Sequence, residues 1–208
     1  MNRLKRLIWC ALLFGIQVMY FPLNRFLEGG MEFKTALDDY VPLWPIWVFP
    51  YGLVCVWWIV AYIWAAWRME DNLYEAFFLA SAFASVAALT MYTVFPTYVI
   101  RTPIPSTDLP SQLLNWIYTN DYAYNAFPSG HVYITTLIAL FWSRLFPAWR
   151  QVLASTVVVV ILATLFTGQH YLPDPIGGLA LAWLSYRIGL WCVTEKDPIR
   201  GRMESAKA

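Results

Sequence analysis

Residues 128–145 read PSGHVYITTLIALFWSRL, an apolar run that has a polar motif at its start and a length that suits a membrane span. A helix needs about 17–25 mostly apolar residues to cross the ~30 Å of bilayer hydrocarbon. Other apolar blocks of similar length precede and follow this one. The whole set is Leu7–Leu23, Ile46–Trp67, Leu73–Phe95, Pro128–Leu145, Val152–Thr167 and Ile176–Val193. The sequence therefore predicts an all-α, polytopic membrane protein in which six transmembrane helices form one bundle.

The composition favours a membrane protein over a soluble one. Apolar residues make up 60% of the chain and charged residues 13%, whereas soluble domains hold about half and about a quarter. The net charge of +1 gives no indication of a nucleic-acid partner. The first block follows Arg3, Lys5 and Arg6 as in a signal peptide, but it is long and no small-residue cleavage pattern follows it, so we interpret it as a retained span. We expect a single domain over residues 1–208.

The distribution of basic residues predicts the orientation. Cytoplasmic loops are richer in Lys and Arg than the loops on the other side of a membrane. With the N-terminus inside, the cytoplasmic segments hold eleven of the 14 Lys and Arg residues, and the opposite face holds Arg25, Lys34 and Arg101. We therefore expect both termini in the cytoplasm and the protein in the plasma or inner membrane.

The three cysteines, Cys10, Cys55 and Cys192, all fall inside predicted spans. They are isolated from one another, so they form no disulfide framework and no Cys-x-x-Cys metal motif. Packing is the interpretation that fits them best. The sequence offers no metal cluster, and we expect neither a metal ion nor another cofactor.

The chain contains two histidines, and each lies in a short motif at the end of an apolar run. Histidine is the side chain best suited to proton and phosphoryl transfer near neutral pH. From His131 the chain crosses the membrane twice before it reaches His170, in two legs of ~27 Å, so we expect both imidazoles on the same, extracytoplasmic face. Asp174 follows His170 by four residues, and its carboxylate can fix one ring nitrogen and leave the other free to attack.

The motif around His131 also predicts an anion site. Pro128 suits the first turn of a helix, and Ser129 and Gly130 add little bulk. Free amide groups at a helix start, together with the helix dipole, favour an anion, so we expect Ser129 and Gly130 to bind substrate. Arg101, in the longer outer loop, is a further candidate substrate ligand. Each residue alone has a structural alternative, such as a buried histidine, a simple turn or a headgroup anchor, but their coincidence on one face indicates phosphoester chemistry on a lipid.

These motifs resemble the signatures of the type 2 phosphatidic acid phosphatase superfamily, which shares its core with the vanadium haloperoxidases. The signatures are Lys-x6-Arg-Pro, Pro-Ser-Gly-His and Ser-Arg-x5-His-x3-Asp, and the match covers about residues 94–178. The second signature is complete at residues 128–131, and the third keeps its histidine and aspartate at the family's spacing. The resemblance implies that His170 is the nucleophile that forms a phosphohistidine, that Asp174 orients it, and that His131 protonates the leaving oxygen.

Two of the three cations in these signatures are absent. If Arg101 is the arginine of the first signature, Thr102 replaces its proline and Val94 its lysine, and Thr164 replaces the arginine of the third signature. A phosphomonoester carries close to two negative charges near neutral pH and a phosphodiester only one, so a site with one arginine and backbone amides favours the diester. The pattern also resembles sphingomyelin synthases and inositol phosphorylceramide synthases, which keep the His, His, Asp set and move a phospho-headgroup between lipids.

The sequence therefore favours a membrane lipid phosphotransferase that passes a phosphoryl group or phospho-headgroup to a hydroxyl acceptor. Two alternatives stay open. One is hydrolysis through the same intermediate by a lipid phosphate or polyprenyl pyrophosphate phosphatase, and the other is a catalytically silent lipid-binding protein. Retention of both histidines and Asp174 argues against the silent protein. The sequence predicts neither the donor and acceptor lipids nor the oligomeric state.

Overall fold

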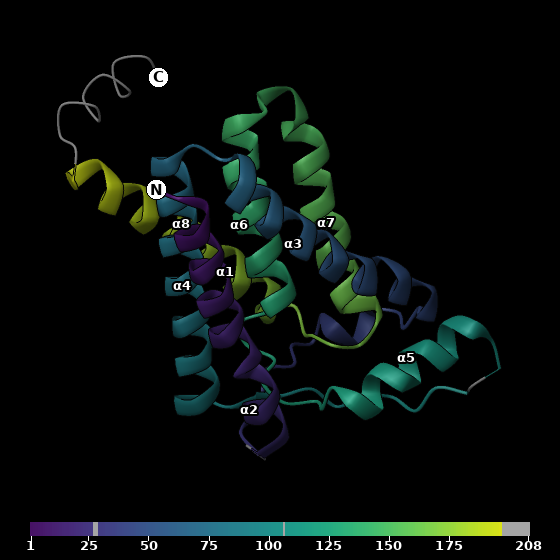
Figure 1. Cartoon of the computed structure of the whole chain (residues 1–208). Helices are drawn as coiled ribbons and strands as arrows, with labels where there is room; N and C mark the ends of the chain where they lie inside the picture. Colours follow the sequence, from purple (N-terminus) through teal and green to yellow (C-terminus); the bar gives the residue numbers. More distant parts are fainter. Residues whose placement is uncertain (27–28, 106, 197–208) are drawn as a thin grey trace.

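The computed structural model describes residues 1–26, 29–105 and 107–196 of the 208-residue chain, which are predominantly helical (Figure 1). The helices are α1 (Arg3–Val18), α2 (Tyr20–Phe26), α3 (Val48–Arg68), α4 (Asp71–Val94), α5 (Leu109–Asn120), α6 (Gly130–Leu145), α7 (Arg150–Phe166) and α8 (Pro173–Lys196). Short 3-10 turns are η1 (Asp38–Tyr40), η2 (Pro45–Trp47) and η3 (Pro147–Trp149). The strands are two residues long, with β1 (Met31–Glu32) paired in parallel to β2 (Thr97–Tyr98).

Five helical segments of the described chain are long and apolar enough to cross a membrane, which confirms an all-α membrane protein. These are Arg3–Phe26, Pro45–Arg68, Asp71–Val94, Pro147–Phe166 and Pro173–Thr194. The predicted span at residues 128–145 forms α6 over 16 residues, a length of about 24 Å, and is not among these five. Six spans and cytoplasmic termini stay predictions, and the C-terminal tail from residue 197 lies outside the described residues.

The central position of α6 explains how it can be shorter than its neighbours. Nine of its residues are buried, and it packs against α3, α4, α7 and α8. Protein rather than lipid therefore surrounds most of its length. Contact with lipid is what requires a helix to match the hydrocarbon thickness, so this requirement is relaxed for α6.

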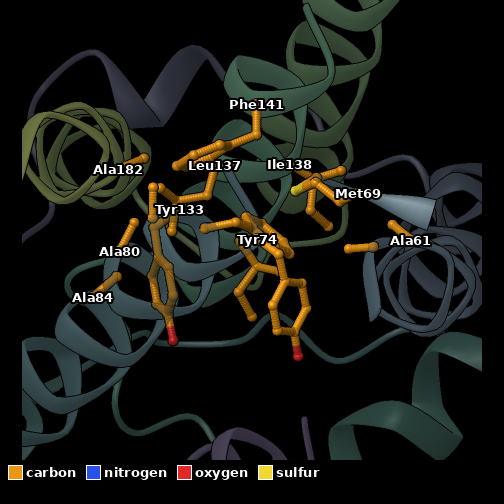
Figure 2. Close-up of a cluster of buried hydrophobic side chains, with 14 of the residues drawn as sticks. Ala61, Met69, Tyr74, Ala80, Ala84, Tyr133, Leu137, Ile138, Phe141 and Ala182 are labelled. Atoms are coloured by element: carbon orange, nitrogen blue, oxygen red, sulfur yellow. The ribbon is translucent and has the colours of Figure 1, made fainter. Parts of the chain in front are cut away.

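Small residues allow α4 and α8 to pack closely. A row of alanines, each at most 1% exposed, recurs every four residues along one face of α4. The row consists of Ala76, Ala80, Ala84 and Ala88. Figure 2 shows two of these alanines in the same buried cluster as Ala182 of α8. On α8, a Cβ added to Gly189 would overlap the carbonyl of Ala76. Close approach of backbones through small residues is a main source of helix association in lipid.

Larger side chains of α4 and α6 fill the rest of this core (Figure 2). Tyr74, Phe77, Leu137, Ile138 and Phe141 are each at most 2% exposed. The rings of Phe77 and Phe141 meet edge to face with centroids 5.2 Å apart, which is a favourable aromatic geometry. This packing fixes the position of α6 against α4, and hence the place where the first residues of α6 emerge.

The starts of α6 and α8 lie at the same end of the bundle as the ends of α4 and α7, and α5 lies crosswise at this end (Figure 1). The N-terminus lies at the opposite end (Figure 1). Two main-chain pairings tie the loops together beside α5, namely β1 with β2 and Tyr98 with Tyr124. Because His131 and Asp174 belong to the first turns of α6 and α8, both histidine motifs are found at this end.

Candidate active site

His170 lies in the histidine loop (residues 167–172), which joins α7 to α8, and each of its ring nitrogens has a partner. Nδ1 lies 3.2 Å from Oδ2 of Asp174, and Nε2 lies 3.1 Å from Oγ of Ser129. The side chains of His170 and Asp174 are 8% and 0% exposed. A carboxylate at Nδ1 favours the tautomer with hydrogen on that nitrogen and leaves the lone pair of Nε2 directed at Ser129.

Main-chain contacts join the two histidine motifs. The amide of Ser129 donates a hydrogen bond to the carbonyl of Asp174 at 3.0 Å. Next to this bond α8 carries two glycines. A Cβ at Gly177 would overlap the ring of Phe127, and one at Gly178 would lie 2.9 Å from the carbonyl oxygen of Ser129. Glycine alone permits such an approach, so the first turns of α6 and α8 are in direct contact.

The start of α6 presents unpaired amides beside His170. The helix begins at Gly130 with Ser129 as its N-cap, and His131 is its second residue. The sequence predicts Pro128 in the first turn of this helix, but it precedes the N-cap. The reason is that Ser129 is extended (φ −60°, ψ 116°) and its amide bonds to the carbonyl of Asp174 in α8. The first amides of a helix have no partner within it, and those of Gly130 and His131 donate to no other acceptor in the described chain. The helix start therefore offers donors and a positive dipole end to an anion.

Three side chains of α3 surround the ring of His131. Tyr51 stacks on it with ring centroids 4.1 Å apart, and Trp58 is tilted against it at 5.0 Å. Sγ of Cys55 lies 3.7 Å from Nε2 of His131. Positions 51, 55 and 58 share one face of a helix. His131 is therefore held in one orientation, within electrostatic reach of His170.

Arg101 lies beside the histidine loop, but its guanidinium already binds protein oxygens. Its two terminal nitrogens donate to the carbonyls of Tyr118, Asp121 and Tyr122 and to the side-chain oxygen of Gln169. The three carbonyls lie at the end of α5, where the negative end of the helix dipole favours a cation. Gln169 directly precedes His170. The structure thus places Arg101 near the site. Its Nε is the one guanidinium nitrogen that has no hydrogen-bond partner in the described chain.

Two acidic residues of the segment between α2 and α3 hold the histidine loop, and sequence reasoning missed them. Tyr171 donates its hydroxyl to Oε1 of Glu32 at 2.6 Å and accepts a hydrogen bond from the amide of Ile100 at 3.1 Å. The amide of Leu172 donates to Oδ1 of Asp38 at 2.7 Å. Burial raises the pKa of Tyr171 to about 12, and its hydrogen bond to Glu32 adds to the shift. The hydroxyl therefore stays protonated and continues to donate near neutral pH.

The positions at which the family signatures carry further cations are neutral here. Val94, the last residue of α4, is 77% exposed. Thr164 is fully buried in α7 and donates its hydroxyl to the carbonyl of Ile161. Lys34, between α2 and α3, pairs with Asp39 at 2.6 Å. In the part of the chain that the structure describes, no group of three or more His, Cys, Asp or Glu side chains is placed to hold a metal ion.

The apolar helices and the two histidine motifs define a class of membrane protein that comparisons with known sequences identify. The profile of the PAP2 superfamily matches residues 23–188, and the chain belongs to that superfamily. The chain is also similar to the inositol phosphorylceramide synthase catalytic subunit aur1 of Schizosaccharomyces pombe, with 31% identity over 103 residues. This match covers 46% of the chain but only 24% of the synthase. No solved structure matches the chain significantly.

Proposed function

We propose that the protein is a lipid phosphotransferase that moves a phospho-headgroup from a phosphodiester lipid to a hydroxyl acceptor through a phosphohistidine at His170. The pair of contacts on this ring carries the proposal. With the Nδ1 hydrogen directed at Asp174, the lone pair of Nε2 faces the hydroxyl of Ser129. The free amides at the start of α6 adjoin that hydroxyl, so the nucleophile and the anion site lie next to each other.

In the first step, Nε2 of His170 attacks the phosphorus and a P–N bond forms. The bond to the leaving lipid oxygen breaks, and His131 donates a proton to that oxygen. Asp174 stabilises the positive charge that develops on the attacking ring. The amides of Gly130 and His131 and the positive end of the α6 dipole stabilise the negative charge on the phosphate oxygens. In the second step the acceptor oxygen bonds to phosphorus, the P–N bond breaks, and the proton of the acceptor hydroxyl is released. Uptake of a proton by His131 then restores the free enzyme.

The charge of the site supports a phosphodiester over a phosphomonoester as donor. Among the described residues, Arg101 is a cation that contacts the histidine loop directly, through Gln169. Its terminal N–H groups all bind protein oxygens. It therefore contributes positive potential more than direct hydrogen bonds. A site with one arginine and a helix dipole matches one negative charge better than two. The similarity to an inositol phosphorylceramide synthase supports the same choice.

The orientation is part of this proposal. Basic residues near the N-terminus and at the α3–α4 and α6–α7 connections lie at the other end of the bundle, which supports an extracytoplasmic site in the plasma or inner membrane. Reactivity of the termini with a membrane-impermeant label in intact cells would test it. Labelling of the N-terminus without permeabilisation would contradict the orientation.

The test of function uses the purified full chain in detergent. Phosphatidylinositol labelled with ³²P is supplied with ceramide or with diacylglycerol, and phosphatidic acid is supplied in a separate reaction. A new labelled lipid that His170→Ala fails to make is the expected result. Release of inorganic phosphate from phosphatidic acid, without a new lipid, would instead identify a phosphatase. If no donor lipid gives a product, the result would support the catalytically silent lipid-binding protein.

A further inference from the structure

Asp121 is a carboxylate at the end of α5 that neither histidine motif includes. The hydroxyl of Tyr20 donates to its Oδ1 at 2.8 Å. Its main-chain carbonyl accepts a hydrogen bond from Arg101. The other carboxylate oxygen, Oδ2, receives no hydrogen bond from the described residues. One side of this carboxyl group is therefore anchored and the other is available.

Arg101 ties Asp121 to the histidine loop. The same guanidinium donates to the carbonyl of Asp121 and to the side chain of Gln169. Gln169 directly precedes His170. The side chain of Arg101 therefore bridges Asp121 and the loop that carries the proposed nucleophile. Asp121 also has an electrostatic interaction with His170 itself.

A second set of contacts ties Asp121 to the motif of the other histidine. Tyr20, the donor to Asp121, meets the ring of Tyr92 edge to face with centroids 6.0 Å apart. The hydroxyl of Tyr92 donates to the carbonyl of Pro128 at 2.8 Å. Asp121 is therefore linked through neighbouring side chains to both the histidine loop and the start of α6.

The electrostatic neighbours of Asp121 include the side chains that hold His131. Tyr51 and Cys55, which contact the His131 ring, both interact with the charge of Asp121. Asp121 is therefore within electrostatic reach of His170 and of two side chains that contact His131. Burial raises the pKa of Asp121, as expected for a charge held away from water.

Neither the hydrogen bond from Tyr20 nor phosphate binding explains why Asp121 has a free carboxylate oxygen beside the histidine loop. The carbonyl oxygen of an asparagine would accept the Tyr20 hydrogen bond equally well. A negative charge opposes a phosphate, so Asp121 is unsuited to bind one. A carboxylate is, however, a strong hydrogen-bond acceptor for a hydroxyl group.

We propose that Asp121 binds the acceptor of the transfer reaction, a neutral lipid or polyol hydroxyl, through Oδ2 and removes its proton. The proposal rests on the phosphohistidine mechanism above. As the acceptor oxygen forms its bond to phosphorus, the P–N bond to Nε2 of His170 breaks and its electron pair returns to the ring. The hydroxyl proton moves to Oδ2 of Asp121. An anionic acceptor is excluded because it would meet this carboxylate with like charge.

The two steps are separated in a single-turnover experiment with the full chain in detergent. Phosphatidylinositol labelled with ³²P is added first, and acid-labile label on the protein is counted. Ceramide is added next, and passage of label to lipid is followed. We expect Asp121→Asn to form labelled protein at the rate of the unsubstituted protein and to pass the label on about 10²-fold more slowly. Asp108→Asn is the matched control, because Asp108 caps the start of the same helix and asparagine caps equally well.

Each outcome decides between the proposals. Transfer at an unchanged rate in Asp121→Asn overturns the role of Asp121, and so does an equal fall in labelling and transfer, which marks a structural role. If the unsubstituted protein acquires no label from any donor lipid, the phosphohistidine mechanism fails and this inference fails with it. Should Asp121→Asn not fold, Asp121→Glu keeps the charge and displaces it by one methylene. For Asp121→Glu we then expect an unchanged rate of protein labelling and a slower transfer of label to lipid. Equal slowing of labelling and of transfer would again overturn the proposal.

Discussion

The main chain of Gly178 lies so close to Ser129 that a Cβ on the glycine would lie 2.9 Å from the carbonyl oxygen of the serine. Ser129 caps α6 and contacts Nε2 of His170 through its hydroxyl. The distance between the proposed nucleophile and the anion site is therefore set by a backbone contact between α6 and α8.

Gly178→Ala is expected to push the start of α6 away from the histidine loop. Overpacking at such a contact costs about 1–3 kcal/mol of stability, and a displacement of about 1 Å at a reacting group can lower turnover about 10²-fold. Thermal unfolding in detergent and turnover measure the two effects. Gly52→Ala in α3 is the control, because nothing lies within 4 Å of its added Cβ. Equal turnover in the two variants would show that this contact does not position the site.

The ring of Tyr51 is expected to position His131 by stacking, since their centroids are 4.1 Å apart. Tyr51→Phe keeps the ring and should retain turnover. Tyr51→Leu removes an aromatic contact of about 0.5–1.5 kcal/mol and should lower turnover about 3- to 10-fold. Because His131 is proposed to protonate the leaving oxygen, the loss should appear in kcat more than in KM. Phe49→Leu, at a half-exposed position of the same helix, should have little effect, and a Tyr51→Phe variant as slow as Tyr51→Leu would contradict the stacking role.

The hydroxyl of Tyr171 is expected to stabilise the histidine loop through Glu32 and the amide of Ile100. Tyr171→Phe leaves both without this partner, at a cost of about 1–3 kcal/mol. Because the pKa of Tyr171 is raised to about 12, the cost should be the same from pH 6 to pH 9. Tyr40→Phe, at a position 83% exposed, should leave the melting temperature unchanged. A Tyr171→Phe defect that appears only at alkaline pH would exclude this explanation.

Asp121 is expected to lower the stability of the protein at neutral pH. Burial raises its pKa in the folded state, whereas an unfolded Asp has a pKa of about 3.9. Below the unfolded value the carboxyl is neutral in both states, and stability is lost as the pH rises through that value and then through the folded pKa. Asp121→Asn, which is neutral throughout, should therefore melt at a higher temperature than the unsubstituted protein at pH 7, with a smaller difference near pH 4. Arg101, His170 and Tyr20 face this carboxyl and lower its pKa, so an Asp121→Asn variant that melts lower at pH 7 would mean that they outweigh burial.

The features that could be predicted from the sequence are those that depend on local pattern and on length. Apolar blocks of span length predict helices, and two spans between His131 and His170 return the chain to one face. The spacing of His170 and Asp174 places the carboxylate within reach of the ring because the loop between them is short. The length of α6 could not be predicted in this way, because it depends on how far other helices shield it from lipid.

The contacts that the sequence did not indicate join residues far apart in the chain. No local spacing relates Tyr51 to His131, or Asp121 to His170. Arg101 was predicted as a substrate ligand on the strength of a signature, yet the end of α5 supplies the carbonyls that occupy its terminal nitrogens. Such contacts depend on how α3 and α5 pack against the bundle, which a single sequence does not determine.

Restoring a family cation should change which phosphate the site accepts. Val94 ends α4 and is 77% exposed, so a lysine at position 94 costs little stability. Its long side chain would extend from the end of the bundle at which the histidine motifs lie (Figure 1). One added charge about 10 Å from a phosphate contributes about 1–2 kcal/mol at an effective dielectric constant of about 20. Val94→Lys should therefore raise the use of phosphatidic acid over phosphatidylinositol about tenfold, measured as the ratio of kcat/KM values. Val94→Gln has a similar length without the charge and should keep the original ratio. If lysine leaves the ratio unchanged, the missing charge does not select the diester, and the preference must come from the shape of the headgroup site.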